Sequence, residues 1–483
     1  MHLPIGRFGA IMDLVTGDSW TADRVASEAA RRGAALAAAG IGRGDAVLVF
    51  HGGTPAFFAD LFAVWSVGGI AACLNPGLTP EELARVAAFV SAKAVCVGAG
   101  APDPRGIELP VMRGDLTPPA DAPALLPGNV LDDPSLMLFT SGTTGMPKGV
   151  VHTFRSILAR LSLNAAHIGP AAMRRTLCTL PTHFGHGLIG NCLSALHAGG
   201  DVFLMPGGSM KAVAGLGETI DAHRIGFMSS VPSFWKMALK LSPPPKGGTL
   251  RRVHVGSAPL AADLWKRVIT WSGGADVVNM YGITETANWL GGAPSSEFEP
   301  RDGLIGRMWG GQVAVLDASG RIAPTGEGEL VVQSPSLMAG YFGREDLSRA
   351  SLVSGWFRTG DIGTVGADGV AVLTGRQKYE INRAGMKVHP EDIDLLLERH
   401  ESVREACAFG LPDEVAGETV GVAVSPHDRS SFDLPALKAW CAARLAREKV
   451  PERWFVVDEI PKTDRGKINR DNVAKACLAQ GRG

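Results

Sequence analysis

From Thr21 onward, short runs of apolar residues alternate with longer segments in which apolar residues recur at helical spacing. At the start of the chain this pattern predicts helices at Arg24–Gly40, Pro55–Gly68 and Pro80–Val90 and strands at Ala46–Phe50, Gly69–Leu74 and Ala94–Val97. It repeats from Ser135 to Tyr281, with strands predicted at Leu136–Phe139, Leu177–Leu180, Val202–Leu204, Gly226–Ser229, Val253–Gly256 and Val277–Met280. Strands that alternate with helices form parallel sheets with crossover helices.

The pattern changes after Gly303. Short strands separated by turn residues are typical of a small antiparallel, barrel-like subdomain, and they are predicted at Val313–Leu316, Gly328–Val332 and Val370–Leu373. Past Gly375 a compact α+β tail is predicted, with a helix, two strands and a helix at Glu391–Arg399, Ala406–Gly410, Val420–Val424 and Leu434–Glu448. We therefore predict an α/β protein: a large N-terminal domain of parallel sheets with helices plus a small β-barrel-like subdomain (1–376), and a small α+β C-terminal domain (377–483).

Composition narrows the function classes. The 483 residues carry 47 Lys and Arg against 48 Asp and Glu, so the chain has no bulk field to attract nucleic acid or an anionic membrane. The longest apolar stretch, Leu61–Leu74, is too short for a membrane span, and the N-terminus lacks the pattern of a signal peptide. Seven scattered cysteines fit neither a disulfide framework nor a zinc site. We expect a soluble, cytoplasmic protein.

The strongest chemical signal is a loop rich in glycine and hydroxyl residues that follows a predicted strand and ends in a lysine. Glycines allow backbone N–H groups to turn toward phosphate oxygens, hydroxyls donate further hydrogen bonds, and the lysine adds charge. The loop is not a Walker A loop, because Pro147 stands where that motif needs glycine. It predicts a phosphate site formed by Thr140, Ser141, Gly142, Thr143, Thr144 and Lys148.

This loop, TSGTTGMPKGV, resembles the phosphate-loop signature of the adenylate-forming superfamily, which includes acyl-CoA synthetases, aryl-acid ligases, luciferases and peptide-synthetase adenylation domains. Four further blocks of that family follow in order, at 281–285 (YGITE), 355–361 (GWFRTGD), 375–390 (from GRQK to Pro390) and 461–467 (PKTDRGK). The resemblance implies ATP- and Mg²⁺-dependent activation of a carboxylic acid as an acyl-adenylate, followed by transfer to coenzyme A. It also implies a mobile C-terminal domain.

The resemblance implies roles for single residues. Thr284 lies beside the α-phosphate, Glu285 ligates Mg²⁺, and Lys467 bridges the carboxylate and the phosphate as they react. Asp361 accepts the ribose hydroxyls with Arg376 nearby, Lys378 is the hinge, and Gly385 borders the pantetheine passage. The segments expected to line the acid and the adenine are Ser230, Gly256, Ser257, Ala258, Pro259, Tyr281 and Gly282.

The predicted acid pocket departs from the family pattern. Relatives often have Pro-x-x-His where this chain has Pro181-Thr182-His183-Phe184, so either His183 or His186 is a candidate to approach the substrate carboxylate. Gly185 occupies the place where peptide-synthetase domains hold an Asp, which disfavours α-amino acids. The bulk of Trp289 disfavours long-chain fatty acids. A small to medium or aromatic acid is therefore expected.

Two other functions remain open. A stand-alone adenylation enzyme passes its adenylate to a carrier-protein thiol or another nucleophile, and the sequence does not distinguish it from a CoA ligase. A nicotinamide-dependent oxidoreductase is the alternative from another class, because residues 185–190 (GHGLIG) match GxGxxG after a predicted strand. The end of the next strand, Val202–Met205, lacks the acidic residue that ribose recognition requires. The prediction is therefore an AMP-forming acyl-CoA ligase.

Overall fold

The computed structural model describes residues 8–98, 103–114, 131–140, 148–205, 209–376, 379–383, 386–413, 417–445, 447–463 and 467–480. Six predicted site residues lie outside these ranges: Ser141, Gly142, Thr143, Thr144, Lys378 and Gly385. The chain divides into two compact units, one of Met1–Gln312 with Val332–Phe357 and one of Val313–Val331 with Arg358–Gly483. These units do not coincide with the predicted domains, because the second unit also takes in Val313–Val331 and begins again at Arg358. The predicted boundary after residue 376 rests on the family resemblance and stays a prediction.

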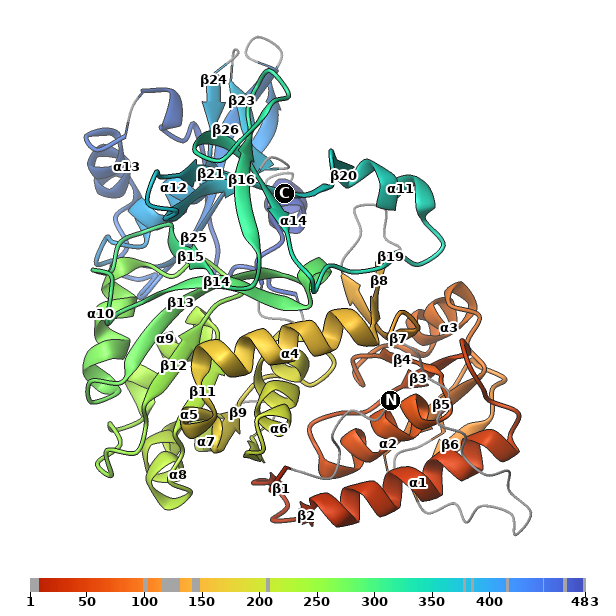
Figure 1. The fold of residues 1–483 in the computed structure, drawn as a ribbon. Coiled ribbons are helices and arrows are strands. Elements are labelled where there is room, and N and C mark those ends of the chain that lie inside the picture. Colours follow the sequence, from red (N-terminus) through yellow and green to blue (C-terminus); the bar gives the residue numbers. More distant parts are fainter. Residues whose placement is uncertain are drawn as a thin grey trace. The chain divides into compact units, whose positions relative to one another are not determined.

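The first sheet of unit 1 has the strand order β19-β8-β7-β4-β3-β5-β6 (Figure 1). Its strands are β3 (Ala46–Val49), β4 (Ile70–Cys73), β5 (Ala94–Val97), β6 (Val111–Arg113), β7 (Pro134–Thr140), β8 (Lys148–Thr153) and β19 (Gly340–Tyr341). The five strands from β6 to β7 run parallel, as predicted. Strand β8 is antiparallel to β7, and β19 is antiparallel to β8. Between the strands lie α1 (Ala22–Ala38), α2 (Pro55–Ser66) and α3 (Pro80–Phe89).

The second sheet of unit 1 contains β15-β14-β13-β12-β11-β9-β10-β1-β2. These are β1 (Ala10–Asp13), β2 (Ser19–Thr21), β9 (Arg175–Cys178), β10 (Asp201–Leu204), β11 (Phe227–Ser230), β12 (Arg252–Val255), β13 (Asp276–Ile283), β14 (Asn288–Pro294) and β15 (Leu304–Met308). Strands β1 and β9–β13 are parallel. Strand β2 is antiparallel to β1, β14 is antiparallel to β13, and β15 is antiparallel to β14. The sheets are therefore mixed, with parallel centres.

The helices of unit 1 that follow β8 are α4 (Phe154–Ile168), α5 (Pro170–Met173), α6 (Ser194–His197), α7 (Met210–Ala214), α8 (Leu216–Ala222), α9 (Pro232–Leu241), α10 (Ala262–Trp271) and α11 (Glu345–Ala350). A π-helical segment, η1 (His186–Leu193), leads into α6, and a 3₁₀ turn, η2 (Thr284–Thr286), follows β13. No helix within the described part of the chain is long and apolar enough to cross a membrane.

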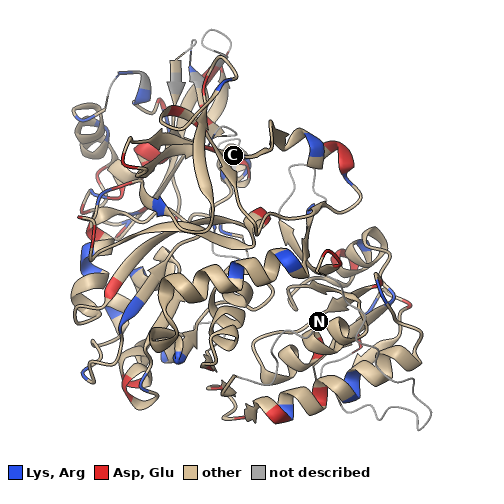
Figure 2. Cartoon of the chain, viewed as in Figure 1, with Lys and Arg blue, Asp and Glu red and all other residues tan. Residues whose placement is uncertain are grey.

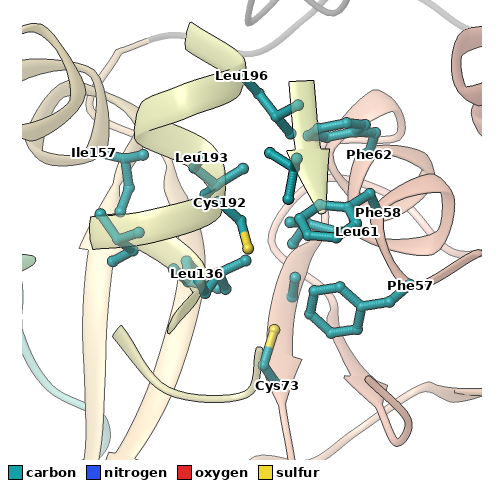
Figure 3. Close-up of a cluster of buried hydrophobic side chains, with 14 of the residues drawn as sticks. Phe57, Phe58, Leu61, Phe62, Cys73, Leu136, Ile157, Cys192, Leu193 and Leu196 are labelled. Carbon is teal, nitrogen blue, oxygen red and sulfur yellow. The ribbon is translucent and has the colours of Figure 1, made fainter. Parts of the chain in front are cut away.

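Helix α2 begins where the sequence requires. Thr54 accepts a hydrogen bond from the Phe57 amide at the N-cap, and Pro55 occupies the first turn, where its missing N–H costs nothing. The helix is apolar on nearly every face and therefore belongs in the core. Figure 3 shows its side chains, Phe58 and Phe62 among them, pointing toward Leu193 and Leu196 of the η1–α6 segment, and all four belong to one buried cluster. Helix α2 thus joins the layers of unit 1.

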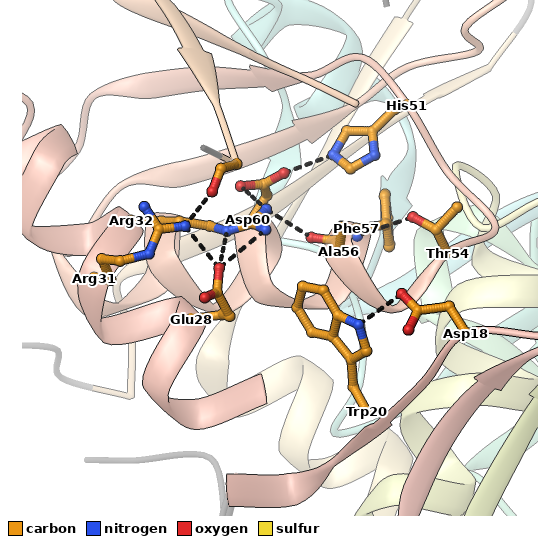
Figure 4. A network of polar contacts seen from close by, with 11 residues as sticks. Asp18, Trp20, Glu28, Arg31, Arg32, His51, Thr54, Ala56, Phe57 and Asp60 are labelled. Carbon is orange, nitrogen blue, oxygen red and sulfur yellow. Dashed lines mark hydrogen bonds and ion pairs between the residues drawn. The ribbon is translucent and has the colours of Figure 1, made fainter. Parts of the chain in front are cut away.

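Asp60 is the one charged residue of α2, and it is 3% exposed. Its carboxylate accepts from Arg32 of α1 at 2.8 Å and pairs with the His51 Nε2 at 2.7 Å (Figure 4). Burial of a carboxylate is tolerated when such partners satisfy it. Figure 2 shows acidic and basic residues along α1, and two half-buried ones, Glu28 and Arg31, form an ion pair at 2.7 Å.

Unit 2 contains two sheets. The first has the order β17-β16-β18-β21-β22, from β16 (Gln312–Leu316), β17 (Ile322–Ala323), β18 (Gly326–Gln333), β21 (Trp356–Val365) and β22 (Ala371–Arg376). The second is built from β23 (Ile381–Arg383), β24 (Met386–Val388), β25 (Val403–Asp413), β26 (Gly417–Pro426) and β27 (Arg453–Val456). Its helices are α12 (Pro390–Leu397), α13 (Leu434–Ala442) and α14 (Arg470–Gln480).

Alternating residues of β25 face two different cores. Ala406 and Ala408 pack with residues of α12 and α13, whereas Cys407 and Phe409 pack with residues of α14. This arrangement follows because successive side chains of a strand point to opposite faces of the sheet. The helix predicted over Leu434–Glu448 is shorter in the structure, and α14 was not predicted.

Candidate active site

Four candidate active-site residues of unit 1 lie at the carboxyl ends of neighbouring parallel strands. Ser230 ends β11, Gly256 follows β12, and Tyr281 and Gly282 lie near the end of β13. Because β11, β12 and β13 pair side by side, these residues share one sheet edge. Ligands of open α/β sheets bind at this edge.

The two ends of the phosphate loop are fixed by strand pairing. Thr140 ends β7 and Lys148 begins β8, and the two residues lie directly opposite each other in the antiparallel ladder. The Lys148 ammonium is 5.4 Å from the centre of the Tyr341 ring. Tyr341 belongs to β19, which pairs with β8, so the lysine and the ring are held on adjacent strands.

Glu285 forms the most informative contact of this region. It lies in the η2 turn after β13, half-buried, and its Oε1 accepts a hydrogen bond of 2.8 Å from the Tyr341 hydroxyl. Burial, followed by the negative charge of Glu285, raises the pKa of Tyr341 well above its usual value, so the phenol keeps its proton and remains the donor. Glu285 and Lys148 are therefore both held against Tyr341.

The sequence reasoning missed Tyr341. The chain contains three tyrosines, and neither the spacing nor the neighbours of this one indicate a partner 56 residues earlier in the chain. Two further residues that it missed, His152 and Arg160, contact the backbone of η2. Its spacing in the sequence could have drawn attention to Arg160. This residue lies on the buried face of α4 with Ile157 and Leu161, where a charged side chain is unexpected.

Close packing accounts for the glycine at position 282. A Cβ there would lie 2.1 Å from the Asn288 carbonyl oxygen, at the bulge where the pairing of β13 and β14 shifts register. At Gly256 the space is less tight, with a Cβ 3.0 Å from the Met280 Cβ, and Ser257 after it has a φ of +68°. Ser257, Ala258 and Pro259 are exposed.

Each of the two candidate pocket histidines is 8% exposed. The His186 Nδ1 lies 2.8 Å from the Ser257 Oγ and its Nε2 lies 2.5 Å from the Ser229 Oγ, so both ring nitrogens already have hydroxyl partners. The His183 ring packs edge-on against Phe184 at 4.0 Å. That one of these histidines approaches the substrate carboxylate stays a prediction.

Trp289 lies deep in the same region, at 2% exposure. Its indole makes edge-to-face contacts with the rings of His254, His186 and Phe227 at 4.6, 5.6 and 6.2 Å. Such a cluster fixes a large side chain in one orientation. Trp289 is therefore a fixed, buried side chain beside His186, and its effect on the length of an acid pocket stays a prediction.

The GxGxxG match at 185–190 has a packing explanation. Residues 186–193 form the buried η1 segment, in which a Cβ at Gly187 would lie 2.3 Å from the Pro181 carbonyl oxygen. A Cβ at Gly190 would lie 2.0 Å from the Asn288 Nδ2. The glycines are needed for close contacts inside the protein, so the segment does not form the exposed phosphate-binding turn that the nicotinamide alternative requires.

Unit 2 carries the remaining predicted residues. Asp361 of β21 and Arg376 of β22 lie opposite each other, and the Arg376 Nε is 2.8 Å from the Asp361 Oδ1. Asp361 is 1% exposed, whereas the Arg376 side chain is 55% exposed. Lys467 is exposed next to an antiparallel bridge between Lys462 and Ile468, and its carbonyl accepts from the Thr463 amide at 2.8 Å.

Comparison with known proteins places the chain in a family. Residues 8–342 match the AMP-binding enzyme family, and residues 392–467 match the C-terminal domain of AMP-binding enzymes. The chain therefore belongs to the AMP-binding enzyme family. It is similar to the sulfoacetate–CoA ligase of Cupriavidus necator, with 31% identity over 94% of this chain and 92% of that protein. It is also similar to the oxalate–CoA ligase of Arabidopsis thaliana, with 34% identity over 72% of this chain and 68% of that protein.

Among solved structures, the o-succinylbenzoate CoA synthetase of Bacillus subtilis in complex with its acyl-adenylate has the same fold. Its TM-score is 0.85 at 22% identity, over 97% of this chain and 95% of that one. Family and relatives together define the activity as that of an AMP-forming acid–thiol ligase, a CoA ligase for acyl or aryl acids. The predicted fold class, family and reaction type are thereby confirmed.

Proposed function

We propose that this CoA ligase uses ATP and Mg²⁺ to activate a small to medium or aromatic carboxylic acid, with Thr284, Glu285 and Lys467 as its catalytic residues. The observation that carries the proposal is the Glu285–Tyr341–Lys148 arrangement. It holds a carboxylate and an ammonium group against one ring, next to the ends of the phosphate loop and at the carboxyl edge of the sheet.

The donor set fits Mg²⁺. A hard cation takes carboxylate and phosphate oxygens and keeps several waters. Glu285 offers a half-buried carboxylate, and the described ranges contain no group of three His, Cys, Asp or Glu that could hold a metal. One protein carboxylate, phosphate oxygens and water therefore suit this site better than a cage of protein ligands. Bound there, the ion would offset charge on the phosphate oxygens.

The chain's own residues supply the remaining chemistry. Lys148 and the hydroxyl of Thr140, which face each other across the β7–β8 ladder, would contact the phosphates, and Thr284 precedes Glu285 in η2. Asp361, held by Arg376, accepts hydrogen bonds from the ribose. Lys467 offsets the negative charge that develops as a carboxylate oxygen attacks the α-phosphate and pyrophosphate leaves. In the second half-reaction the CoA thiol attacks the acyl carbon and AMP leaves.

Two observations favour a short or aromatic acid. Trp289 is buried against the rings of His186 and His254, and its bulk beside the predicted pocket disfavours a long alkyl chain. Two of the relatives are named for short acids, oxalate and sulfoacetate. The polar groups around His186, the hydroxyls of Ser229 and Ser257, suit an acid with a second polar group.

The test is pyrophosphate exchange over a panel of carboxylic acids, with and without CoA. Lys467→Ala should abolish exchange while leaving the melting temperature nearly unchanged, because an exposed lysine contributes little to folding. Glu285→Gln should weaken the dependence on Mg²⁺. If Lys467→Ala keeps near-normal exchange, the assigned role is wrong, and release of the adenylate to a carrier protein but not to CoA would favour the stand-alone adenylation enzyme.

A further inference from the structure

Each of the three backbone carbonyl groups of the η2 turn accepts a hydrogen bond from a residue outside the turn. The Thr284 oxygen accepts from the His152 Nε2 at 2.8 Å, and the Glu285 oxygen accepts from the Met338 amide at 2.7 Å. The Thr286 oxygen accepts from the Arg160 Nε at 3.3 Å and from the Ser336 hydroxyl at 2.8 Å. The turn that carries Thr284 and Glu285 is therefore fixed residue by residue through its backbone.

Arg160 is the unusual member of this set. It is 0% exposed, and its Nη2 donates to the Gly310 carbonyl and to the hydroxyls of Ser334 and Ser336 at 3.2, 3.2 and 2.5 Å. Among the described residues no carboxylate pairs with it. A buried charge without a counter-ion is costly, and burial lowers the pKa of Arg160 to about 9, which still leaves it charged at neutral pH.

The surroundings are shaped to accept this guanidinium. A Cβ at position 310 would lie 2.1 Å from the Arg160 Nη1, so only glycine leaves room for it. The chain leaves η2 through two consecutive residues with positive φ that are not glycine, Ala287 at +55° and Asn288 at +90°. Such strained backbone persists only where the surrounding contacts over-determine it.

His152 contributes as a neutral donor. It is 0% exposed, and burial, with a smaller contribution from the charge of Arg160, lowers its pKa to about 4 even though the Thr284 contact acts in the opposite direction. Because a carbonyl oxygen only accepts, the proton lies on Nε2, and Nδ1 faces the Ser156 hydroxyl at 3.3 Å. His152 at the end of β8 and Arg160 in α4 thus contact the same turn from two adjoining elements.

We propose that Arg160 and His152 are positioning residues for adenylate formation: by holding the carbonyls of Thr284 and Thr286 they fix the direction in which Thr284 and Glu285 present their side chains to the nucleotide and Mg²⁺. Preorganised groups stabilise a transition state without reorganisation at the moment of reaction. This inference rests on the proposed function of Glu285. It adds the residues that hold the backbone of the turn in place.

Asn164 provides a matched control. It lies one turn after Arg160 in α4, is also 0% exposed, and donates to the Ser194 hydroxyl at 3.0 Å rather than to η2. Arg160→Met and Asn164→Leu each replace a buried polar side chain of α4 by an apolar one. Both should lower the melting temperature, but only Arg160→Met releases the Thr286 carbonyl from its guanidinium.

The experiment measures pyrophosphate exchange against Mg²⁺ concentration. Arg160→Met should lower kcat at least ~tenfold, which corresponds to about 1.4 kcal/mol of transition-state stabilisation, and should weaken the apparent Mg²⁺ affinity. The KM for the acid should change less than ~twofold, and Asn164→Leu should change all three values less than ~twofold. Ser336→Ala removes a hydroxyl that contacts both Arg160 and Thr286, and should shift kcat and the Mg²⁺ dependence in the same direction by a smaller factor.

Combination with Glu285→Gln separates the two proposals. If Arg160 acts partly through Glu285, Arg160→Met should slow Glu285→Gln by a smaller factor than it slows the wild type, because only the positioning of Thr284 is then left to lose. Kinetic parameters of Arg160→Met that match those of Asn164→Leu would overturn the positioning role. If Arg160→Met does not fold, unchanged kinetics in Ser336→Ala overturn it instead. Normal exchange in Glu285→Gln alone would contradict the proposed function and leave no carboxylate to position.

Discussion

Buried His152 makes the stability of this protein sensitive to acid, and the size of the effect follows from its pKa. The pKa is about 4 in the folded protein and about 6.5 in an unfolded chain, mainly because burial disfavours the charged imidazolium. Between these two pH values the unfolded chain binds a proton that the folded protein does not. The free energy of unfolding therefore falls as the pH decreases from 6.5 toward 4, and above about pH 7 this residue contributes no further change.

The magnitude is substantial. A difference of about 2.5 between the two pKa values, at about 1.36 kcal/mol each, gives a total loss of about 3.4 kcal/mol once the pH is below 4. About 2 kcal/mol of this should already be lost at pH 5. His152→Gln removes the titrating group and keeps an N–H donor for the Thr284 carbonyl, so the variant should lack this part of the pH dependence.

The assay is urea unfolding of wild type and His152→Gln at pH 7 and pH 5, followed by tryptophan fluorescence. Burial also lowers the pKa of His167 and His254, but these residues are present in both proteins and cancel in the comparison. The loss of unfolding free energy between the two pH values should be about 2 kcal/mol larger in wild type. Equal losses in the two proteins would refute the reasoning that His152 is neutral in the fold.

Three further predictions address packing, the nucleotide and domain alternation. Gly190→Ala places a Cβ 2.0 Å from the Asn288 Nδ2 and should destabilise the protein by about 1–3 kcal/mol in thermal unfolding; an unchanged melting temperature would contradict the tight packing of η1. Asp361→Ala should raise the KM for ATP at least ~tenfold and spare the KM of the acid, and equal effects on both would remove Asp361 from the ribose site. Lys378→Pro should preserve adenylate formation and abolish thioester formation, and parallel loss of both half-reactions would argue against a hinge at this position.

Local sequence determined the elements and the chemistry. The predicted helix Pro55–Gly68 agrees closely with α2 (Pro55–Ser66). Its start is set by the cap residue Thr54 and by Pro55, and its length by the apolar run that follows, and all of these are local features of the sequence. The order of helices and strands gave the α/β class, and the loop at 138–149 with its four companion blocks indicated the family. The roles assigned to Lys467 and Asp361 stay predictions.

Other features depended on contacts between residues far apart in the chain. The first strand lies beside β10, with Ile11 opposite Val202, and the Tyr341 hydroxyl meets Glu285. The glycines at 187 and 190 resembled a dinucleotide motif because sequence shows their spacing but not the Pro181 carbonyl and Asn288 amide that crowd them.

Arg160 shows the same limit most clearly. In sequence it is one of two arginines in α4, and although its place on the apolar stripe is unusual for a charged residue, nothing there names its partners. Its burial against Thr286 and Gly310 depends on backbone carbonyls 126 and 150 residues later in the chain. Propensity and periodicity act over a few residues, whereas the partners of a buried polar group are chosen by the packing of whole elements. The sequence therefore determined which helix and which motif would form, and the tertiary structure decided which side chains hold the catalytic turn.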